Sequence, residues 1–233
     1  MRIVLICALS FFCFVFNAFA NEKITISNVG SETSLIAFSI LSSAYKKLDI
    51  QLEYVEYPGK RAAIMANSGK TDGDTMRIKG FDKDFPNLVM VPVPVIAIEW
   101  MAIATDPTIE INGWKSLAPY TIGIRLGIKK TEIATKGMKV DKVNQYESIV
   151  KKVSFGRNDI GVLPKITALI HLKKSGLANV KILEPPVDTT PLYHYLYKDN
   201  RHLVDGIAQA LKEMKSSGET EKIMQKEIQK LLK

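Results

Sequence analysis

The stretch "NLVMVPVPVIAIEWMAIAT", residues 87–105, decides how this chain is organised. It is long, apolar and extended, but Pro92 and Pro94 lack the N–H that an ordinary central strand donates, so an ordinary central strand is excluded. Strands alternate with helices before it, and the same alternation starts again after it. A second extended segment, near residues 186–197, follows this second set. The pattern predicts a chain that leaves one lobe, builds another and returns.

Apolar periodicity places the elements on either side of these two crossings. Strands are predicted at 23–28, 50–57, from Asp72 onward, 120–125, 159–163 and 180–184, and helices at 32–48, 58–69, around 148–153, at 167–174 and on both sides of Gly218. Such alternation favours an α/β fold with parallel or mixed sheets. We expect lobe 1 to contain residues 21–98 and 191–233, lobe 2 to contain 99–190, and the ligand cleft to lie between them.

The first twenty residues have the form of a signal peptide. Arg2 precedes an uncharged apolar run, and "AFA" at 18–20 has the small-x-small form of a cleavage site. We expect export through Sec to the periplasm and removal of residues 1–20. Cys7 and Cys13 both lie in this segment without a lipoprotein cleavage box, so lipidation is not expected and the mature chain has no thiol chemistry.

The net charge of +8 is compatible with nucleic acid, an anionic membrane or a small anionic ligand as partner. Export argues against nucleic acid, and the scattered lysines are typical of solvated helix faces. The three histidines lie far apart, and no nucleophile motif or phosphate loop is present. We therefore expect no metal, no cofactor and no catalytic residue.

Five segments in order resemble one family: the type II periplasmic solute-binding proteins, extracellular solute-binding family 3. The matching segments are "ITISN" (24–28), "PGKRAAIMANSGKTDGDTMR" (58–77), "WKSLAPYTIGIRLG" (114–127), "YESIVKKVSFGRNDIGVL" (146–163) and "YHYLYKDNRHLVDGIAQALKEMKSSGETEKIMQK" (193–226). The resemblance implies the two-lobed type II fold, a monomer that binds without catalysis, and hinged closure on a ligand. It also implies the permease of an ABC importer as partner, usually for polar amino acids.

In that family a lobe 1 arginine grips the ligand's carboxylate, and Arg77 fits this role here. A guanidinium offers a planar fork of donors that matches a carboxylate. The alternative is a surface arginine at a strand end, paired with Asp72, Asp74 or Asp82.

The family's anchor for the ligand's α-ammonium is an aspartate, and the corresponding position here holds Pro164. Leaving a buried charge unpaired costs free energy, so an ordinary α-amino acid, whose ammonium would lack a partner at Pro164, should bind weakly. Glu99 or Asp188 could substitute, although Glu99 could equally be a hinge-strand residue facing water.

Lobe 2 offers Arg125 at a strand end, with Lys129, Lys130 and Thr131 at the start of the next helix. The resemblance makes this loop the holder of the ligand's other end, and a helix N-terminus favours anions. Solvated lysines are the alternative. Tyr57 is a candidate cleft aromatic. These residues predict a small carboxylate, or an amino acid with an extra acid, as ligand.

Two other functions share this fold. One is a periplasmic dehydratase-like enzyme that acts on a small acid, and the other is an accessory protein that signals a bound ligand to a membrane receptor. Both would use the same cleft, so the residues alone leave them open.

Overall fold

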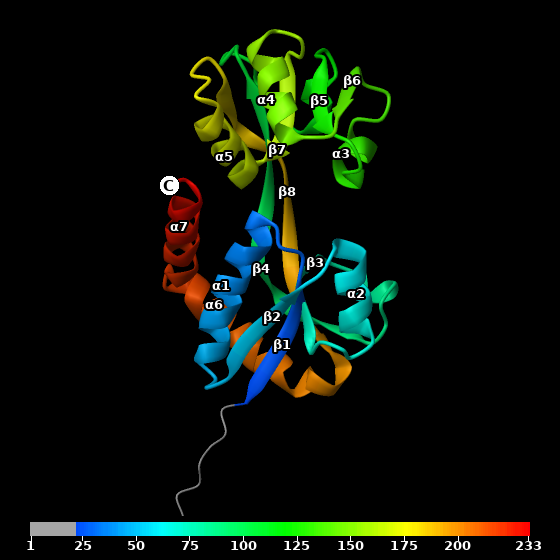
Figure 1. The fold of residues 1–233 in the computed structure, drawn as a ribbon, viewed down its shortest axis with the longest axis vertical. Helices are drawn as coiled ribbons and strands as arrows, with labels where there is room; N and C mark the ends of the chain where they lie inside the picture. Colours follow the sequence, from blue (N-terminus) through cyan, green and yellow to red (C-terminus); the bar gives the residue numbers. More distant parts are fainter. Residues whose placement is uncertain (1–21) are drawn as a thin grey trace, which may run out of the picture.

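The computed structural model describes residues 22–233, and the predicted signal peptide lies outside the described residues. Two lobes are joined by two long strands, with helices on both sides of the sheet in each lobe (Figure 1). This confirms the predicted α/β fold of the type II two-lobed kind. Within residues 22–233, no helix combines the length and the apolar character that crossing a membrane requires.

The strands and helices follow the predicted order. The strands are β1 Lys23–Asn28, β2 Gln51–Glu56, β3 Gly73–Ile78, β4 Leu88–Ala104, β5 Ile122–Arg125, β6 Val140–Val143, β7 Ile160–Pro164 and β8 Lys181–Tyr197. The helices are α1 Glu32–Lys46, α2 Gly59–Asn67, α3 Lys129–Ala134, α4 Tyr146–Ser154, α5 Lys165–Ser175, α6 Val204–Ser216 and α7 Glu219–Leu231. Strand β6 was not predicted, because its four residues are too few for a periodic signal.

One sheet of eight strands passes through both lobes in the order β2-β1-β3-β8-β4-β7-β5-β6. Strands β4 and β8 pair antiparallel from Leu88 with Tyr197 to Ala104 with Lys181, with shifts of register along the way. In lobe 1 strand β8 also pairs with β3, and in lobe 2 strand β4 also pairs with β7. The two crossings predicted from the sequence are therefore β4 and β8. This pair of strands connects the two lobes (Figure 1).

The prolines of β4 lie where its ladder with β8 is irregular. Register shifts separate Met90 from Pro94 and Pro94 from Ile96. A proline cannot donate to a ladder, so it is tolerated where the pairing is interrupted. The expectation of an unusual strand is confirmed: β4 is central in the sheet order, yet its regular pairing breaks at the prolines.

The core of lobe 1 is formed by α1 and α6 against the sheet, with Ile26, Ile40 and Leu211 among its buried members. Ser31 caps α1 by accepting a hydrogen bond from the Ser34 N–H at 3.2 Å. At the C-terminal end, Gly218 has a φ of 74° and separates α6 from α7, as predicted.

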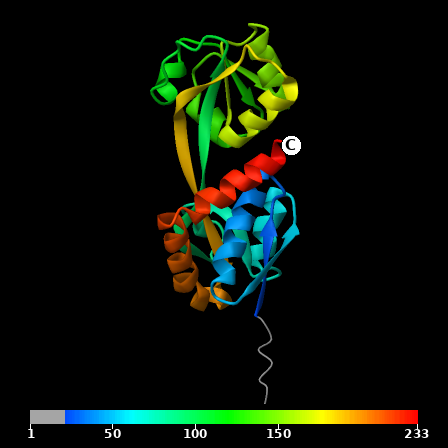
Figure 2. The same cartoon turned by 90° about the vertical axis from the view of Figure 1, so that its left-hand side faces the viewer.

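Helix α7 extends from lobe 1 along the gap between the lobes and approaches lobe 2 (Figure 2). Its end shares a small groove with α5 of lobe 2, formed by Leu231, Leu232 and Lys233 with Ile170, Lys173 and Lys174. Helix α7 has no fully buried residue. It therefore flanks the gap and reaches the opposite lobe.

Candidate functional site

Arg77 lies near the end of β3 and is held by lobe 1 itself. Its Nη2 donates to Asp74 Oδ2 at 2.6 Å and to the carbonyl oxygen of Gly59 at 3.1 Å, and its Cζ lies 5.0 Å from the centre of the Phe81 ring. The side chain is 17% exposed. The structure thus shows the Asp74 pairing that the sequence raised as an alternative. Because a guanidinium has five N–H donors, two bonds from Nη2 leave others unused.

Asp74 belongs to a buried polar network that supports Arg77. Ser27 Oγ donates to Asp74 Oδ2 at 3.1 Å, while the Asp74 carbonyl oxygen lies 2.8 Å from His194 Nδ1, and His194 Nε2 lies 2.9 Å from the Tyr45 hydroxyl. Burial raises the pKa of Asp74, and Arg77 opposes this rise. Burial also lowers the pKa of His194 to about 4. The network holds Asp74 in place, and Asp74 in turn fixes the position of the Arg77 guanidinium.

Arg125 and Thr131 lie in lobe 2, around α3. The Arg125 guanidinium carbon is 4.8 Å from the centre of the Tyr146 ring, where a cation–π contact orients it. Thr131 is buried, and its hydroxyl donates to the Ile128 carbonyl oxygen at 3.0 Å. Helix α3 has only six residues, so its N-terminus carries a smaller dipole than that of a longer helix. The Thr131 hydroxyl is already used by the local backbone.

The two lysines of α3 differ. Lys130 Nζ lies 2.6 Å from Asp188 Oδ2 on β8, and the same oxygen accepts a hydrogen bond from Trp114 Nε1 at 2.9 Å. Lys129 makes no ion pair within residues 22–233. Lys130 therefore ties α3 to a crossing strand, whereas Lys129 keeps its charge available.

Glu99 is paired in the same manner as Asp188. Its Oε2 lies 2.9 Å from Lys165 Nζ, and Lys165 also lies 3.3 Å from Glu184 Oε1 on β8. Lys165 is the first residue of α5 and directly follows Pro164. These two carboxylates raise the pKa of Lys165, with the Glu99 hydrogen bond as the main cause. Both acids proposed as substitutes for an ammonium anchor are thus neutralised by lysines of the chain.

Tyr57 follows β2 at the start of α2 and is half-buried. Its N–H donates to the Asn28 carbonyl oxygen at 2.9 Å, and the Arg61 guanidinium carbon lies 5.5 Å from the centre of its ring. Tyr57 is therefore placed on the α2 side of lobe 1, where Arg77 reaches Gly59.

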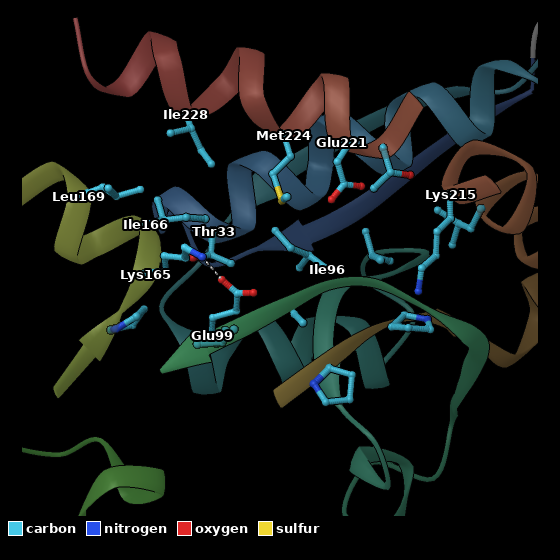
Figure 3. A pocket seen from close by; sticks show the side chains of 18 residues that line it. Thr33, Ile96, Glu99, Lys165, Ile166, Leu169, Lys215, Glu221, Met224 and Ile228 are labelled. Carbon is cyan, nitrogen blue, oxygen red and sulfur yellow. Dashed lines mark ion pairs between the residues drawn. The ribbon is translucent and has the colours of Figure 1, made fainter. Parts of the chain in front are cut away.

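A cavity of about 540 Å³ lies between β4, α5 and α7, beside the crossing strands, and we name it the hinge cavity (Figure 3). Its walls come from both lobes and are mostly apolar. The lining residues are Thr33, Pro94, Val95, Ile96, Ala97, Ile98, Glu99, Pro164, Lys165, Ile166, Leu169, Pro191, Leu211, Lys215, Thr220, Glu221, Met224 and Ile228.

Glu99 is the one predicted site residue in this lining; Arg77, Arg125, Lys129, Lys130, Thr131 and Tyr57 lie outside it. Lys165 and the α7 residues were not among the predicted site residues. A signal for Lys165 was present, because it directly follows the proline at the family's anchor position. The helix after Gly218 was predicted, but no sequence signal indicated that it lines a cavity. It reaches the cavity only through the packing of the lobes.

Arg77 and the hinge cavity lie at the same level of the sheet. Arg77 of β3 is the register partner of Tyr193 on β8, and Tyr193 is the partner of Pro94 on β4, which lines the cavity. Two strand spacings, about 10 Å, separate the two positions along this row. Arg77 and Pro94 are therefore two strands apart in the same row of the sheet.

No family model matches the chain. The chain is similar to the L-cystine-binding protein TcyA of Bacillus subtilis, with 34% identity over 199 residues, which covers 80% of this chain and 69% of TcyA.

Solved structures share the fold. The Bacillus subtilis protein YCKB superposes with a TM-score of 0.71 and 21% identity, covering 91% of this chain and 93% of YCKB. A histidine kinase sensor domain with similarity to periplasmic binding proteins gives a TM-score of 0.63 and 12% identity, covering 88% and 96%. Together with the identity to TcyA and the two-lobed architecture, this leads to one conclusion: the chain belongs to the type II periplasmic solute-binding proteins, extracellular solute-binding family 3.

Proposed function

We propose that this solute-binding protein captures a small carboxylate, or an amino-acid-like molecule with an extra acid, and delivers it to the permease of an ABC importer. The ligand binds between the lobes, and closure about β4 and β8 encloses it. The name of TcyA, an L-cystine-binding protein, supports an amino-acid-like ligand.

The observation that carries the ligand class is the pairing of acids with lysines. Glu99 is bound to Lys165 at 2.9 Å and Asp188 to Lys130 at 2.6 Å. A ligand ammonium would have to displace one of these lysines. Arg77, Arg125 and Lys129 meanwhile offer positive charge to a carboxylate.

We propose that Arg77 binds the carboxylate on lobe 1, with Tyr57 beside it, and that Arg125 and Lys129 approach from lobe 2. Asp74 and Gly59 hold the Arg77 Nη2 group in place. Such fixing lowers the entropy lost when the ligand binds, because the side chain is already ordered.

A thermal-shift panel tests the ligand class. A bound ligand raises the melting temperature by mass action. We expect small dicarboxylates, and amino acids with an extra acid, to raise it more than glutamine, arginine or lysine. A larger shift with a neutral or cationic α-amino acid would refute the anionic ligand.

We propose that the protein binds without turnover. A dehydratase-like enzyme would convert the carboxylate that stabilises it, so mass spectrometry of that carboxylate after incubation separates the two. Uptake of the same labelled carboxylate by cells with and without the gene separates transport from sensing, since only an importer component changes accumulation.

We propose a periplasmic location, which rests on the predicted removal of residues 1–20. The intact mass of the protein from a periplasmic extract should correspond to a chain that begins at Asn21 without a lipid. A chain that retains residues 1–20 would overturn this part of the proposal.

A further inference from the structure

Four charged side chains line the hinge cavity, and their charges cancel. Glu99 and Glu221 are acidic, and Lys165 and Lys215 are basic. Of these four, Glu99 and Lys165 are bound to each other, whereas Glu221 and Lys215 make no ion pair within residues 22–233. Figure 3 shows Glu99 and Lys165 pointing toward one another at the end of the cavity nearest α5.

The Lys165 ammonium lies between two carboxylates, 2.9 Å from Glu99 and 3.3 Å from Glu184. Glu184 is 59% exposed and does not line the cavity, so the part of this group that faces the cavity is the neutral Glu99–Lys165 pair. Two neighbouring carboxylates could bind the ammonium or guanidinium of a ligand. Here the ammonium of Lys165 already occupies that position.

We infer that Lys165 is an internal counter-ion that occupies Glu99 and thereby closes the hinge cavity to cationic ligands. The ligand group that enters the cavity is then uncharged and mainly apolar, because the rest of the wall is built from residues such as Ile96, Leu169 and Met224. The inference rests on the proposed function, and it excludes cationic groups from the part of the ligand that reaches the hinge cavity.

Removing the Lys165 charge should convert Glu99 into a cation site. The test is calorimetric titration of the wild-type protein and Lys165→Gln with L-arginine and with L-citrulline, its uncharged analogue of nearly the same shape. The wild-type protein should show no preference for arginine. Lys165→Gln should bind arginine about two- to fivefold more tightly than citrulline, because Glu99 is 39% exposed and an ion pair this exposed is weak. Lys165→Arg, which keeps the ion pair, should behave as the wild-type protein.

The matched control is Lys215→Gln. It lowers the charge of the cavity lining by the same amount but leaves Glu99 paired, so it should show no arginine preference. An arginine preference of equal size in both variants would show a general charge effect and would overturn the inference. So would a Lys165→Gln variant that lacks the preference or binds neither amino acid.

Agmatine, a guanidinium compound without a carboxylate, separates this inference from the proposed function. If agmatine binds Lys165→Gln but not the wild-type protein while no carboxylate stabilises the wild-type protein, the counter-ion role stands and the carboxylate ligand falls. If carboxylates stabilise the wild-type protein and Lys165→Gln gains no affinity for agmatine, the carboxylate ligand stands and the counter-ion role falls. Lys165 and Glu99 are each more than a third exposed, so Lys165→Gln should fold.

Discussion

Arg77 Nη2 donates to Asp74 Oδ2 at 2.6 Å, and the Asp74 side chain is only 2% exposed. The guanidinium therefore has two roles: it is the candidate ligand-binding group, and it is the counter-ion of a buried carboxylate. A loss of affinity in a variant without the Arg77 guanidinium could therefore arise from either role. Separate measurements of stability and of affinity on Arg77 variants distinguish the two roles.

Arg77→Ala should lower the free energy of unfolding by about 3–5 kcal/mol, because breaking a buried pair leaves one charge uncompensated. Adding Asp74→Asn should restore part of the loss, which chemical denaturation of the single and double variants measures. Arg61→Ala is the control, since this exposed arginine should change stability by about 0.5 kcal/mol or less. Equal stability of Arg77→Ala and the wild-type protein would mean that Asp74 does not depend on Arg77.

Arg77→Lys should keep a positive charge beside Asp74 but lose the planar fork of donors. We expect its stability to stay near that of the wild-type protein and its affinity for the stabilising carboxylate to fall about a hundredfold. Calorimetry with the best carboxylate from the thermal-shift panel measures this. Undiminished affinity would return Arg77 to a purely structural role.

Lys129 and Lys130 form a matched pair for separating structure from binding. Lys130→Ala removes the ion pair with Asp188 and should cost up to about 1 kcal/mol, because Lys130 is 44% exposed. Lys129→Ala should leave stability unchanged but weaken carboxylate binding, with a steeper loss at low ionic strength. If Lys129→Ala changes neither quantity, Lys129 is a solvated lysine.

The buried His194 should make stability depend on pH. Its pKa is about 4 when folded and 6.5 ordinarily, so between these values the unfolded chain binds a proton that the folded chain does not. The contribution of neutral His194 to the free energy of unfolding is therefore fully present above pH 6.5. It falls by about 3 kcal/mol as the pH drops to 4.

Urea denaturation between pH 7 and pH 4 measures this slope, and His194→Gln should reduce it. The raised pKa of Asp74 acts in the opposite direction, since a folded state that holds its proton more tightly gains stability as the pH falls. Repeating the comparison in an Asp74→Asn background removes that contribution.

Gly73→Ala should destabilise lobe 1 next to Arg77. A Cβ at Gly73 would lie 2.3 Å from the Tyr195 carbonyl oxygen, a contact that β3 and β8 must separate to relieve. We expect a loss of about 1–3 kcal/mol by thermal or chemical denaturation. At Gly59 a Cβ meets no atom within 4 Å, so Gly59→Ala should be neutral or slightly stabilising.

The sequence by itself determined the order of elements and the two crossings. Apolar periodicity is a local property, and it located both helices next to Gly218 and the strand from Asp72 onward, which begins at Gly73 in the structure. Pro92 and Pro94 marked β4 as unusual because a missing N–H is also local. The arginine at the end of β3 was likewise readable from sequence, together with Asp74 as one of its candidate partners.

Only the tertiary structure decided which charges are paired and where the hinge cavity lies. Lys165 meets Glu99, and Lys130 meets Asp188, across distances of 58 residues or more along the chain. The cavity needs α7 from one lobe and α5 from the other. Such contacts depend on how distant segments pack, and no local pattern of residues encodes them, so the acids that could have held an ammonium were recognisable in the sequence but their neutralisation was not.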